Sequence, residues 1–475
     1  MLDDTPHGEL LAALHAVLGD RGMLLGADTR AYCHDWRDLY HGATPVVIRP
    51  ADVAELSAAV KICAARGVAM VPQGGNTSMV GGAVPDESGA QVVVSLARLN
   101  RVRDLDPVDM SMVVEAGVPW QTAQAHAAAA RLLLPLSISS EGTAQVGGIL
   151  STNAGGNNTL RYGNARDLVL GIEAVMPDGE VLHALRRLRK DNTGYALRHL
   201  LIGAEGTLGF ITAAVLKLVP RPVETVVALC GVPSPGAATE LFRMFQRHDA
   251  ATIQAFEFMS GTGMGFVLAH IPGVTLPLAS PAPHYALIEL ATTRTGAGLR
   301  ASLETVLEAA LEAGLVEDAA IAESGAQRDA IWKLREEHAE GQKRAGASIK
   351  NDVSVPIARV AELIERASAA CVALIPGTRP VPFGHLGDGN IHFNLEQPIN
   401  MDAAAFLARN DEVMHTVNDI VRELDGSFSA EHGVGRLKTG MMPEWRGGAE
   451  LDTMRRIKAA LDPNGLMNPG KLLPA

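Results

Sequence analysis

Two histidines lie seven positions apart in the peptide GHLGDGNIHFN. His385 and His392 stand on either side of an Asp-Gly pair at 388–389, and such a pair is a favoured two-residue hairpin turn. With that turn the two histidines lie directly opposite each other, and Phe383 and Asn394 share their face. Two imidazoles placed in this way can bind one metal ion at ~2.0–2.1 Å. The spacing therefore predicts part of a metal site on a β-hairpin.

A third ligand could come from the peptide SAEHGVG, in which Glu431 directly precedes His432. Two histidines and one glutamate with an open position form a recognised catalytic zinc arrangement. The alternative is an imidazole pair hydrogen-bonded in a core, with Glu431 and His432 as an ordinary surface pair. From these residues alone both interpretations stay open.

Glycines gather in a second stretch, PQGGNTS at 72–78, which follows a short apolar run that predicts a strand. Its backbone N–H groups carry little side-chain bulk around them and suit phosphate oxygens. A plain surface turn explains the same residues equally well. The sequence contains neither a Walker loop nor a G-x-G-x-x-G motif, and GTGMGF at 261–266 has the wrong spacing.

The hydrophobic pattern predicts the elements that must position these residues. Residues 52–67 predict a helix with a capping pattern at its start and Gly67 at its end. Short apolar runs on both sides make this a β–α–β unit that leads into the glycine stretch. Two prolines within 219–226 indicate a domain junction. Further helices are expected over 7–19, 235–248, 299–314, 326–345, 402–424 and 449–461.

Length and composition limit the class of protein. The chain has 475 residues, enough for two or three domains, and its net charge of −12 comes without a basic run. That balance argues against nucleic acid as a partner. Four cysteines without a CxxC pair are typical of a reducing compartment. The acidic N-terminus is unlike a signal peptide and no apolar run approaches ~18 residues, so we expect a cytoplasmic protein without a transmembrane segment.

Three more segments carry a resemblance: SEGTAQVGGILSTNAGGNNTLRYG at 140–163, KDNTGY at 190–195 and GAEGTLG at 203–209. Together with the first glycine stretch they resemble, in the same order, the flavin domain of the vanillyl-alcohol-oxidase superfamily. Where this superfamily links its flavin covalently to a histidine, the present chain has Thr77, so we expect non-covalent FAD. The resemblance implies that FAD is contacted by Pro72, Gly74, Gly75, Asn76, Thr77, Ser78, Gly142, Thr143, Gly147, Gly148, Thr152, Asn153, Gly206 and Ile211.

The peptides GHLGDGNIHFN, SAEHGVGRLK and LDPNGLMNPGK narrow the resemblance, over nearly the whole chain, to the FAD-linked D-2-hydroxy-acid dehydrogenases. This group includes D-2-hydroxyglutarate dehydrogenase, D-lactate dehydrogenase and the glycolate oxidase large subunit. The implied fold is α+β, with a two-part FAD-binding domain, an α+β substrate (cap) domain and a C-terminal helical segment. The implied bounds are 1–40 for an N-terminal helical segment, 41–220 for the FAD-binding domain, 221–415 for the cap domain, and 416–475 for the segment that completes the flavin site.

The same resemblance assigns roles to the site residues. His385, His392 and Glu431 would bind a divalent metal, zinc or alternatively manganese. His432 would be the general base, and Asn468 would approach the flavin. Metal coordination would lower the pKa of a 2-hydroxy group, His432 would take its proton, and the C2 hydride would pass to flavin N5. The product would be a 2-keto acid.

Arg335, Lys350 and Asn394 would hold the substrate carboxylates, although a solvated surface position is the common alternative for a lone cation. Relatives that act on 2-hydroxyglutarate are similar to this chain in having a lysine two residues before the aspartate of this run. They commonly also have threonine or serine one helical turn after the arginine, where this chain has Ala339. We therefore expect D-2-hydroxyglutarate, or D-malate, ahead of D-lactate or glycolate.

The electron acceptor stays open between an electron-transfer flavoprotein, a quinone and a cytochrome, whereas NAD is not expected without a dinucleotide fingerprint. The resemblance also implies a homodimer.

Two other functional classes share the implied fold. A non-redox flavoenzyme of the alkyl-dihydroxyacetone-phosphate synthase type carries a run of histidines that this chain lacks, and a silent flavin subunit tends to lose metal ligands that this chain keeps.

Overall fold

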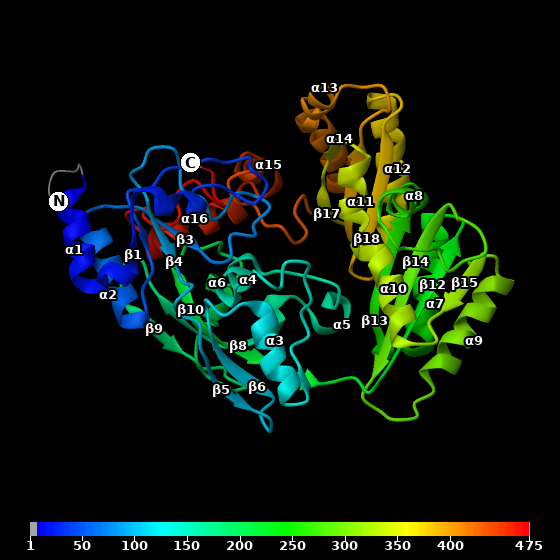
Figure 1. Cartoon of the computed structure of the whole chain (residues 1–475), viewed down its shortest axis with the longest axis horizontal. Coiled ribbons are helices and arrows are strands. Elements are labelled where there is room, and N and C mark those ends of the chain that lie inside the picture. The colour runs from blue at the N-terminus through cyan, green and yellow to red at the C-terminus, as the bar shows by residue number, and fades with distance from the viewer. Residues whose placement is uncertain (1–6, 475) are drawn as a thin grey trace. The chain divides into compact units, whose positions relative to one another are not determined.

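The computed structural model describes residues 7–474, and within them the chain divides into two compact units. Unit 1 comprises the described parts of Met1–Gly156, Gly163–Arg221 and Glu431–Ala475, and unit 2 comprises Asn157–Tyr162 and Pro222–Ala430. The elements of each unit are labelled in Figure 1.

Unit 1 begins with a four-stranded sheet in the order β1-β2-β4-β3, in which β2, β4 and β3 run parallel. Its strands are β1 Met23–Leu24, β2 Val47–Ile48, β3 Met70–Gln73 and β4 Val92–Ser95. Helices α1 Gly8–Leu18 and α2 Val53–Ala65 share one apolar core with this sheet. The predicted start of α2 is confirmed, since the Asp52 carboxylate accepts the Glu55 N–H at 2.8 Å.

A second, antiparallel sheet in unit 1 has the order β5-β6-β10-β8-β9. Its strands are β5 Val102–Asp106, β6 Ser111–Glu115, β8 Val169–Val175, β9 Val181–Ala184 and β10 Phe210–Lys217, and β7 Leu132–Leu133 pairs separately with β11 Val219–Pro220. The other helices of unit 1 are α3 Trp120–Ala129, α4 Val146–Thr152, α6 Arg198–Leu201, α15 Met442–Trp445 and α16 Ala449–Leu461. The last of these coincides with the helix expected over 449–461.

Unit 2 is built on one large antiparallel sheet in the order β15-β12-β14-β13-β18-β19-β16, with β17 also paired to β19. Its strands are β12 Glu224–Val232, β13 Ile253–Ser260, β14 His284–Thr292, β15 Asp318–Ile321, β16 Ser348–Ile349, β17 Asp352–Ser354, β18 Arg379–His385 and β19 Asn390–Glu396. Because successive side chains alternate between the faces of a sheet, every strand contributes to two different layers.

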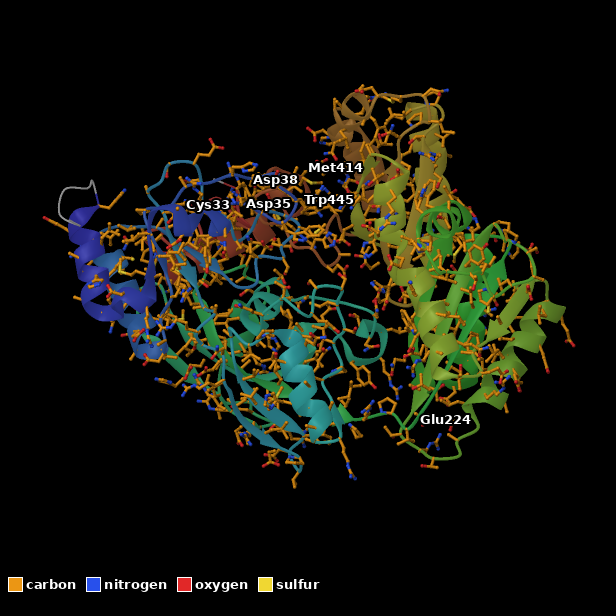
Figure 2. The ribbon with its side chains drawn as sticks, viewed as in Figure 1. Cys33, Asp35, Asp38, Glu224, Met414 and Trp445 are labelled. Carbon is orange, nitrogen blue, oxygen red and sulfur yellow. The ribbon has the colours of Figure 1, made fainter. Side chains whose placement is uncertain are left out.

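Helices cover both faces of the unit 2 sheet. α8 Gly261–His270, α10 Gly325–Glu336 and α11 His338–Ala345 lie on the face that carries Met259 and Phe383. α7 Pro235–Asp249, α9 Leu299–Glu312 and α12 Val360–Leu374 belong to the opposite layer, where the ring centroids of Phe242 and Phe256 lie 5.0 Å apart. Glu224, labelled in Figure 2, accepts the N–H of Leu299 at 3.0 Å and so satisfies the first turn of α9.

Two of the predicted helices are interrupted. The expected helix over 326–345 divides into α10 and α11 at Glu337, just before the His338 ring meets the Leu334 carbonyl at 2.8 Å. A side chain that hydrogen-bonds to the backbone four residues earlier competes with the helical ladder, which gives a local reason for the break. The expected helix over 402–424 divides into α13 Ala403–Leu407 and α14 Asn410–Glu423. Unit 2 also holds the short α5 Thr159–Tyr162.

Candidate active site

The histidine hairpin is formed by β18 and β19, but its register differs from the prediction. His385 pairs with Asn390 and Phe383 pairs with His392, so the connection is the four-residue stretch 386–389 instead of an Asp-Gly turn. The direct opposition of the two histidines was therefore wrong. The shared face is nevertheless correct, because a slip of two residues returns every side chain to the same side of the sheet. The two imidazole centroids lie 5.8 Å apart as diagonal neighbours.

Local chemistry explains the longer turn. Asp388 accepts the Asn390 N–H on its side chain at 3.1 Å, and Gly389 takes a left-handed conformation at φ +86°. A Cβ at Gly389 would lie 2.2 Å from the Val355 carbonyl oxygen, so the turn packs directly on the backbone of a neighbouring segment. That contact could not be anticipated from the hairpin sequence by itself.

Glu257 on β13 connects two of the predicted site residues. One carboxylate oxygen lies 2.8 Å from His385 Nδ1, and the other accepts Arg335 Nε–H at 2.8 Å. All three side chains are buried. Burial alone would raise the pKa of Glu257, but the charges and hydrogen bonds of His385 and Arg335 lower it to about 2. Glu257 is thus a carboxylate across the working pH range.

This contact decides which nitrogen of His385 can bind a metal. A carboxylate only accepts hydrogen bonds, so Nδ1 carries the proton, and Nε2 is the nitrogen whose lone pair a metal would need. The Arg335 guanidinium lies over the Phe383 ring, with Cζ 5.0 Å from the ring centroid. Sequence analysis missed Glu257, whose only signal was a lone acid between Phe256 and Phe258 in an apolar strand.

Replacing Glu257 with glutamine is expected to lower the free energy of unfolding by about 3 kcal/mol, because a buried guanidinium loses its counter-charge. Divalent-metal affinity should fall about 10- to 100-fold, because the orientation of His385 is no longer fixed. Denaturant titration and metal content by mass spectrometry measure the two effects. Glu289→Gln is the matched control, since Glu289 is buried on the next strand and accepts only from neutral Gln254 and Trp332. Equal metal affinity in both variants would contradict the assigned role.

On the side of β19 that faces away from β18, strand β17 places an acidic residue that was not predicted from the sequence. Asp352 on β17 pairs with His392, and Asp352 Oδ1 lies 3.6 Å from His392 Nδ1. Asn390 Nδ2 donates to the same Asp352 oxygen at 3.0 Å. Aspartate, histidine and glutamate are all ligands of divalent metals. Among residues 7–474, Asp352, His392, Glu431 and His432 form a candidate metal-ligand group, to which His385 does not belong.

The segment that leads to Glu431 is hydrogen-bonded to β17 within unit 2. Ser427 forms a bridge with Ser354 at the end of β17, and the Ala430 N–H lies 3.4 Å from the Asp352 carbonyl oxygen. Glu431 is the next residue and His432 follows it, with His432 Nε2 3.9 Å from Glu431 Oε1.

Glu205 fixes the continuation of this segment within unit 1. Its two carboxylate oxygens accept the Val434 and Gly435 N–H groups, each at 2.7 Å. A Cβ at Gly433 would lie 2.7 Å from Glu205 Oε1, so only glycine fits beside the carboxylate. Burial raises the pKa of Glu205, against the two backbone hydrogen bonds and the charge of Lys438. The sequence signal for this contact was the acid in GAEGTLG, whose partner lies 229 positions away.

The predicted substrate residues all lie in unit 2. Arg335 and Asn394 are buried and Lys350 is exposed. Lys350 stands between the pairs Ile349–Leu395 and Asp352–His392, which places it across from Asn394 in the same register. Asn394 follows His392 by two positions and therefore shares its face. Ala339, in the first turn of α11, is exposed.

Glu396 continues the same row by two further positions. It is fully buried, and neither carboxylate oxygen receives a well-formed hydrogen bond from the part of the chain that the structure describes. Burial raises its pKa to about 7, although Arg379, Lys350 and the Ser348 hydroxyl act in the opposite direction. The carboxyl group therefore changes its charge close to neutral pH.

Glu396→Gln is expected to be more stable than the natural protein at pH 8 by about 1–3 kcal/mol and equal to it at pH 4.5. The folded-state pKa lies above the unfolded value of 4.5, so the natural protein loses stability as pH rises from there to about 7. Thermal unfolding at several pH values measures the difference. Glu308→Gln, at an exposed position on α9, is the control and should show no such trend. A pH-independent difference between Glu396→Gln and the natural protein would refute the prediction.

The glycine-rich loops of unit 1 meet as the predicted flavin site requires. A Cβ at Gly75 would lie 2.1 Å from the Thr143 carbonyl oxygen, and one at Gly206 would lie 2.8 Å from the Pro72 ring. A Cβ at Gly74 would lie 3.6 Å from the Gly148 nitrogen. Loops far apart in sequence therefore converge backbone to backbone.

The loop after β3 also offers unused donors. The backbone N–H groups of residues 75–78 donate to no acceptor within residues 7–474, and Asn76 holds a left-handed conformation at φ +52°. Such a concavity of N–H groups suits the oxygens of a pyrophosphate. Asn153 also has positive φ, and its side-chain oxygen accepts the Arg166 N–H at 2.9 Å.

Asn468 closes this region from the C-terminal end. Its side-chain amide donates to the Gly82 and Glu205 carbonyls at 2.9 and 2.8 Å, while Oδ1 is buried without a partner among the described residues. The remaining predicted flavin residues have other surroundings. A Cβ at Gly142 would meet Gln121 Oε1 at 3.6 Å, and one at Gly147 would lie 2.8 Å from the Ala116 Cβ. The Thr152 hydroxyl donates to the Gly148 carbonyl of its own helix, and Ile211 is buried in β10 opposite Ala174.

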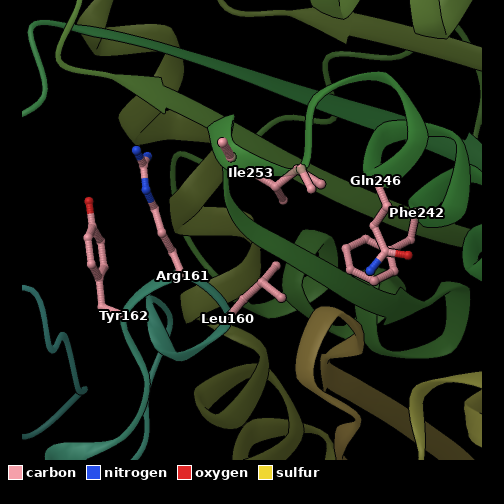
Figure 3. Close-up of a pocket in the computed structure, with 8 residues that line it drawn as sticks. Leu160, Arg161, Tyr162, Phe242, Gln246 and Ile253 are labelled. Carbon is pink, nitrogen blue, oxygen red and sulfur yellow. The ribbon is translucent and has the colours of Figure 1, made fainter. Parts of the chain in front are cut away.

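A separate pocket of about 420 Å³ lies in unit 2, and none of the predicted site residues lines it. Figure 3 shows Arg161 and Tyr162 extending side by side from α5, with Phe242 and Gln246 on another wall. Arg161 already donates to the Ala291 carbonyl at 2.7 Å. This pocket contains none of the candidate catalytic side chains.

Comparison with known families agrees with this arrangement. The model described as an FAD binding domain matches residues 44–185, and the one described as the C-terminal domain of FAD linked oxidases matches residues 221–472. The chain belongs to the FAD-linked oxidase family. The α+β fold with an FAD-binding domain, expected from the sequence, is thereby confirmed.

Relatives of this FAD-linked oxidase extend over almost its full length. A D-2-hydroxyglutarate dehydrogenase of Xanthomonas citri pv. viticola is 36% identical, covering 94% of this chain and 93% of the relative. The protein of the same name from Stutzerimonas stutzeri is 35% identical, covering 98% and 99%. The mitochondrial D-2-hydroxyglutarate dehydrogenase of Bos taurus is 36% identical, covering 98% and 83%.

Solved structures place the FAD-linked oxidase in the vanillyl-alcohol-oxidase fold. An alkyldihydroxyacetonephosphate synthase matches with a TM-score of 0.75 at 18% identity, covering 98% of this chain and 85% of that one. A p-cresol methylhydroxylase matches with a TM-score of 0.75 at 17% identity, covering 98% and 96%. At such low identity the likeness shows the fold alone. Across residues 7–474 no helix has the length and apolar character needed to span a membrane.

Proposed function

We propose that this FAD-linked oxidase oxidises a D-2-hydroxy acid to the 2-keto acid, and that its substrate is D-2-hydroxyglutarate or D-malate. The observation that carries the proposal is the single face of the unit 2 sheet. On it His385, His392 and Asn394 lie in one layer with Arg335, which Glu257 holds beside them. The names of the three relatives support the choice of substrate.

FAD fits the residues present, because converging glycine loops leave a row of unused N–H groups. We propose that it binds without a covalent link, since Thr77 cannot form one. A divalent metal, zinc or alternatively manganese, fits His392 and Glu431 of the candidate metal-ligand group, with Asp352 of the same group as a further candidate. His385 lies outside that group and is kept as a third ligand on the resemblance of its peptide. When bound, FAD supplies a hydride acceptor and the metal supplies Lewis-acid polarisation of a hydroxyl group.

His432 has the remaining task of taking the hydroxyl proton. An imidazole is a suitable general base near neutral pH. Glu205 determines where this residue stands, because it fixes the backbone of Val434 and Gly435 two and three positions later. A rigid backbone next to His432 would keep its imidazole ring within reach of the substrate's 2-hydroxyl group.

Arg335 and Lys350 supply two cations, as a substrate with two carboxylates requires. Arg335 uses Nε for Glu257, so its terminal N–H groups are the ones that would meet a carboxylate. Ala339 provides no hydroxyl at the position where relatives commonly have one. D-lactate or glycolate, with one carboxylate, is therefore the alternative substrate class.

Two other functions compete with this one. The likeness to an alkyldihydroxyacetonephosphate synthase raises the non-redox alternative, but that likeness rests on 18% identity. A silent flavin subunit is disfavoured by the candidate metal-ligand group. Flavin reduction by a 2-hydroxy acid is incompatible with both.

The experiment is an anaerobic panel of D- and L-2-hydroxy acids, scored by loss of flavin absorbance with and without chelator. Bleaching by D-2-hydroxyglutarate or D-malate ahead of D-lactate is expected. Bleaching by none of them would refute dehydrogenase activity, and a preference for D-lactate would refute the dicarboxylate assignment.

The reduced flavin needs an acceptor, and we propose an electron-transfer flavoprotein, a quinone or a cytochrome in place of NAD. We propose no nucleic-acid partner, because the net charge of −12 comes without a basic run. A cytoplasmic location is supported by four buried, unpaired cysteines, which are typical of a reducing compartment. A homodimer is proposed from the family alone, and sedimentation would test it.

A further inference from the structure

Gln342 on α11 is a fully buried polar side chain on the face of the candidate site. Its Oε1 accepts a hydrogen bond from Asn394 Nδ2 at 3.0 Å, and both side chains are buried. Its own amide nitrogen, Nε2, meets no acceptor anywhere in the described part of the chain. Sequence analysis gave Gln342 no role.

Close packing holds Gln342 where it is. A Cβ at the preceding residue, Gly341, would lie 3.1 Å from the Val267 nitrogen, so α11 runs directly against the backbone of α8. One turn earlier, His338 is fully buried between Gly263 and Phe383, with its ring 5.2 Å from the phenyl ring. Burial lowers the pKa of His338 to about 3, so the ring is neutral. The helix offers Gln342 no room to turn away from Asn394.

The orientation of the Asn394 side-chain amide depends on this contact with Gln342. A primary amide presents an oxygen on one side and an NH₂ group on the other, and a rotation by half a turn exchanges them. A carboxylate can be bound only by the NH₂ side. By accepting one of the two N–H groups, Gln342 Oε1 fixes which way the Asn394 amide lies.

The unsatisfied Nε2 indicates that this contact does not serve stability. A buried N–H group without an acceptor costs free energy, whereas an apolar side chain of similar volume at this position would avoid that cost. Local rules of packing are most often broken at functional sites. A stabilising residue would be expected to have its own hydrogen bonds complete.

We propose that Gln342 is a positioning residue, which holds the Asn394 amide in the one orientation that binds a substrate carboxylate. The proposal rests on the proposed function, in which Asn394 contacts the substrate. It extends the site to a residue that acts through its hydrogen bond to Asn394 and does not itself contact the substrate. It also gives this chain a specificity determinant on the same helix as Ala339.

The test compares two variants of the full-length, FAD-loaded protein. Gln342→Met removes the acceptor at nearly constant volume, and Gln342→Glu keeps an acceptor oxygen for Asn394. Gln342→Met should raise KM for D-2-hydroxyglutarate about tenfold, with kcat within about threefold and Tm unchanged or raised by about 2 °C. Gln342→Glu should return KM to within about threefold of the natural value.

A double-mutant cycle separates positioning from general disturbance. In an Asn394→Ala background, Gln342→Met should add no further increase in KM, because the residue to be positioned is gone. An unchanged KM in Gln342→Met, or a tenfold effect that persists without Asn394, would overturn the proposal. A fall in Tm that accompanies the KM effect in both variants would also overturn it, since that pattern belongs to a structural residue.

Failure of the proposed function is distinguishable from failure of this inference. The natural protein is tested first for flavin reduction by D-2-hydroxy acids. If it shows none, the proposed function is wrong and Gln342 loses its role with it. If it is active and Gln342→Met behaves identically to it, only the positioning role is wrong.

Discussion

Replacement of His432 with asparagine is expected to slow flavin reduction by a D-2-hydroxy acid about 10²- to 10⁴-fold. Asparagine keeps a hydrogen-bonding group of similar size but cannot take a proton near neutral pH. FAD content should be unchanged, because the glycine-rich loops that we propose to hold FAD are at 72–78, 142–153 and 203–209 in the chain. Stopped-flow absorbance under anaerobic conditions measures the reduction rate, and released flavin measures FAD content.

The control for this variant is His248→Asn, at an exposed position in the last turn of α7. It should reduce its flavin at the natural rate. If His432→Asn does the same, His432 is not the base. If His432→Asn loses its FAD, the slower reduction has a different cause and the assignment also fails.

Replacement of His392 with alanine is expected to abolish stoichiometric metal binding and to lower the rate of flavin reduction by about 10³-fold or more. His392 belongs to the candidate metal-ligand group and lies beside Asp352 on the edge of β19. Removing one ligand from a small set leaves too few donors to hold the ion. Metal content by mass spectrometry and anaerobic flavin reduction give independent readings.

A matched variant, His415→Ala, removes an exposed imidazole from α14 in the same unit. It should keep full metal content and activity. Activity of His392→Ala at the natural level after chelation would show that the reaction needs no metal. Full metal content in His392→Ala would place the ion elsewhere.

The histidine face could be predicted from sequence although its register could not. A hairpin sequence fixes the alternation of side chains, and an error of two residues leaves that alternation intact. The turn itself depends on Gly389 packing against the Val355 backbone, which lies outside the hairpin. The conclusion about the shared face was therefore more robust than the geometry from which it was drawn.

The hydrogen-bond partners of the site residues could not be predicted from the sequence, for a physical reason. Glu257 lies 128 positions from His385, and Gln342 lies 52 positions from Asn394, so only the folded sheet brings them together. Asp352 meets His392 through strand pairing across β17 and β19. A motif shows residues that are close in sequence, whereas hydrogen-bond partners that orient them come from neighbouring strands and helices.

The convergence of the glycine-rich loops was easier to predict. Glycine is required where backbones approach closely, and Gly75 and Gly206 do so against Thr143 and Pro72. The clustering of glycines in the sequence therefore indicated that these distant loops contact one another. Ile211, by contrast, carried no such signal and is buried within a strand.

The central claim is that this protein removes a hydride from a D-2-hydroxy acid. The most direct measurement is a single anaerobic mixing of the oxidised, FAD-loaded protein with D-2-hydroxyglutarate and, separately, with its L-enantiomer. We expect the flavin absorbance to bleach with the D-enantiomer, with 2-ketoglutarate formed in equal amount, and to persist with the L-enantiomer. Bleaching by the L-enantiomer alone, or by neither enantiomer when D-malate is also without effect, would contradict the account.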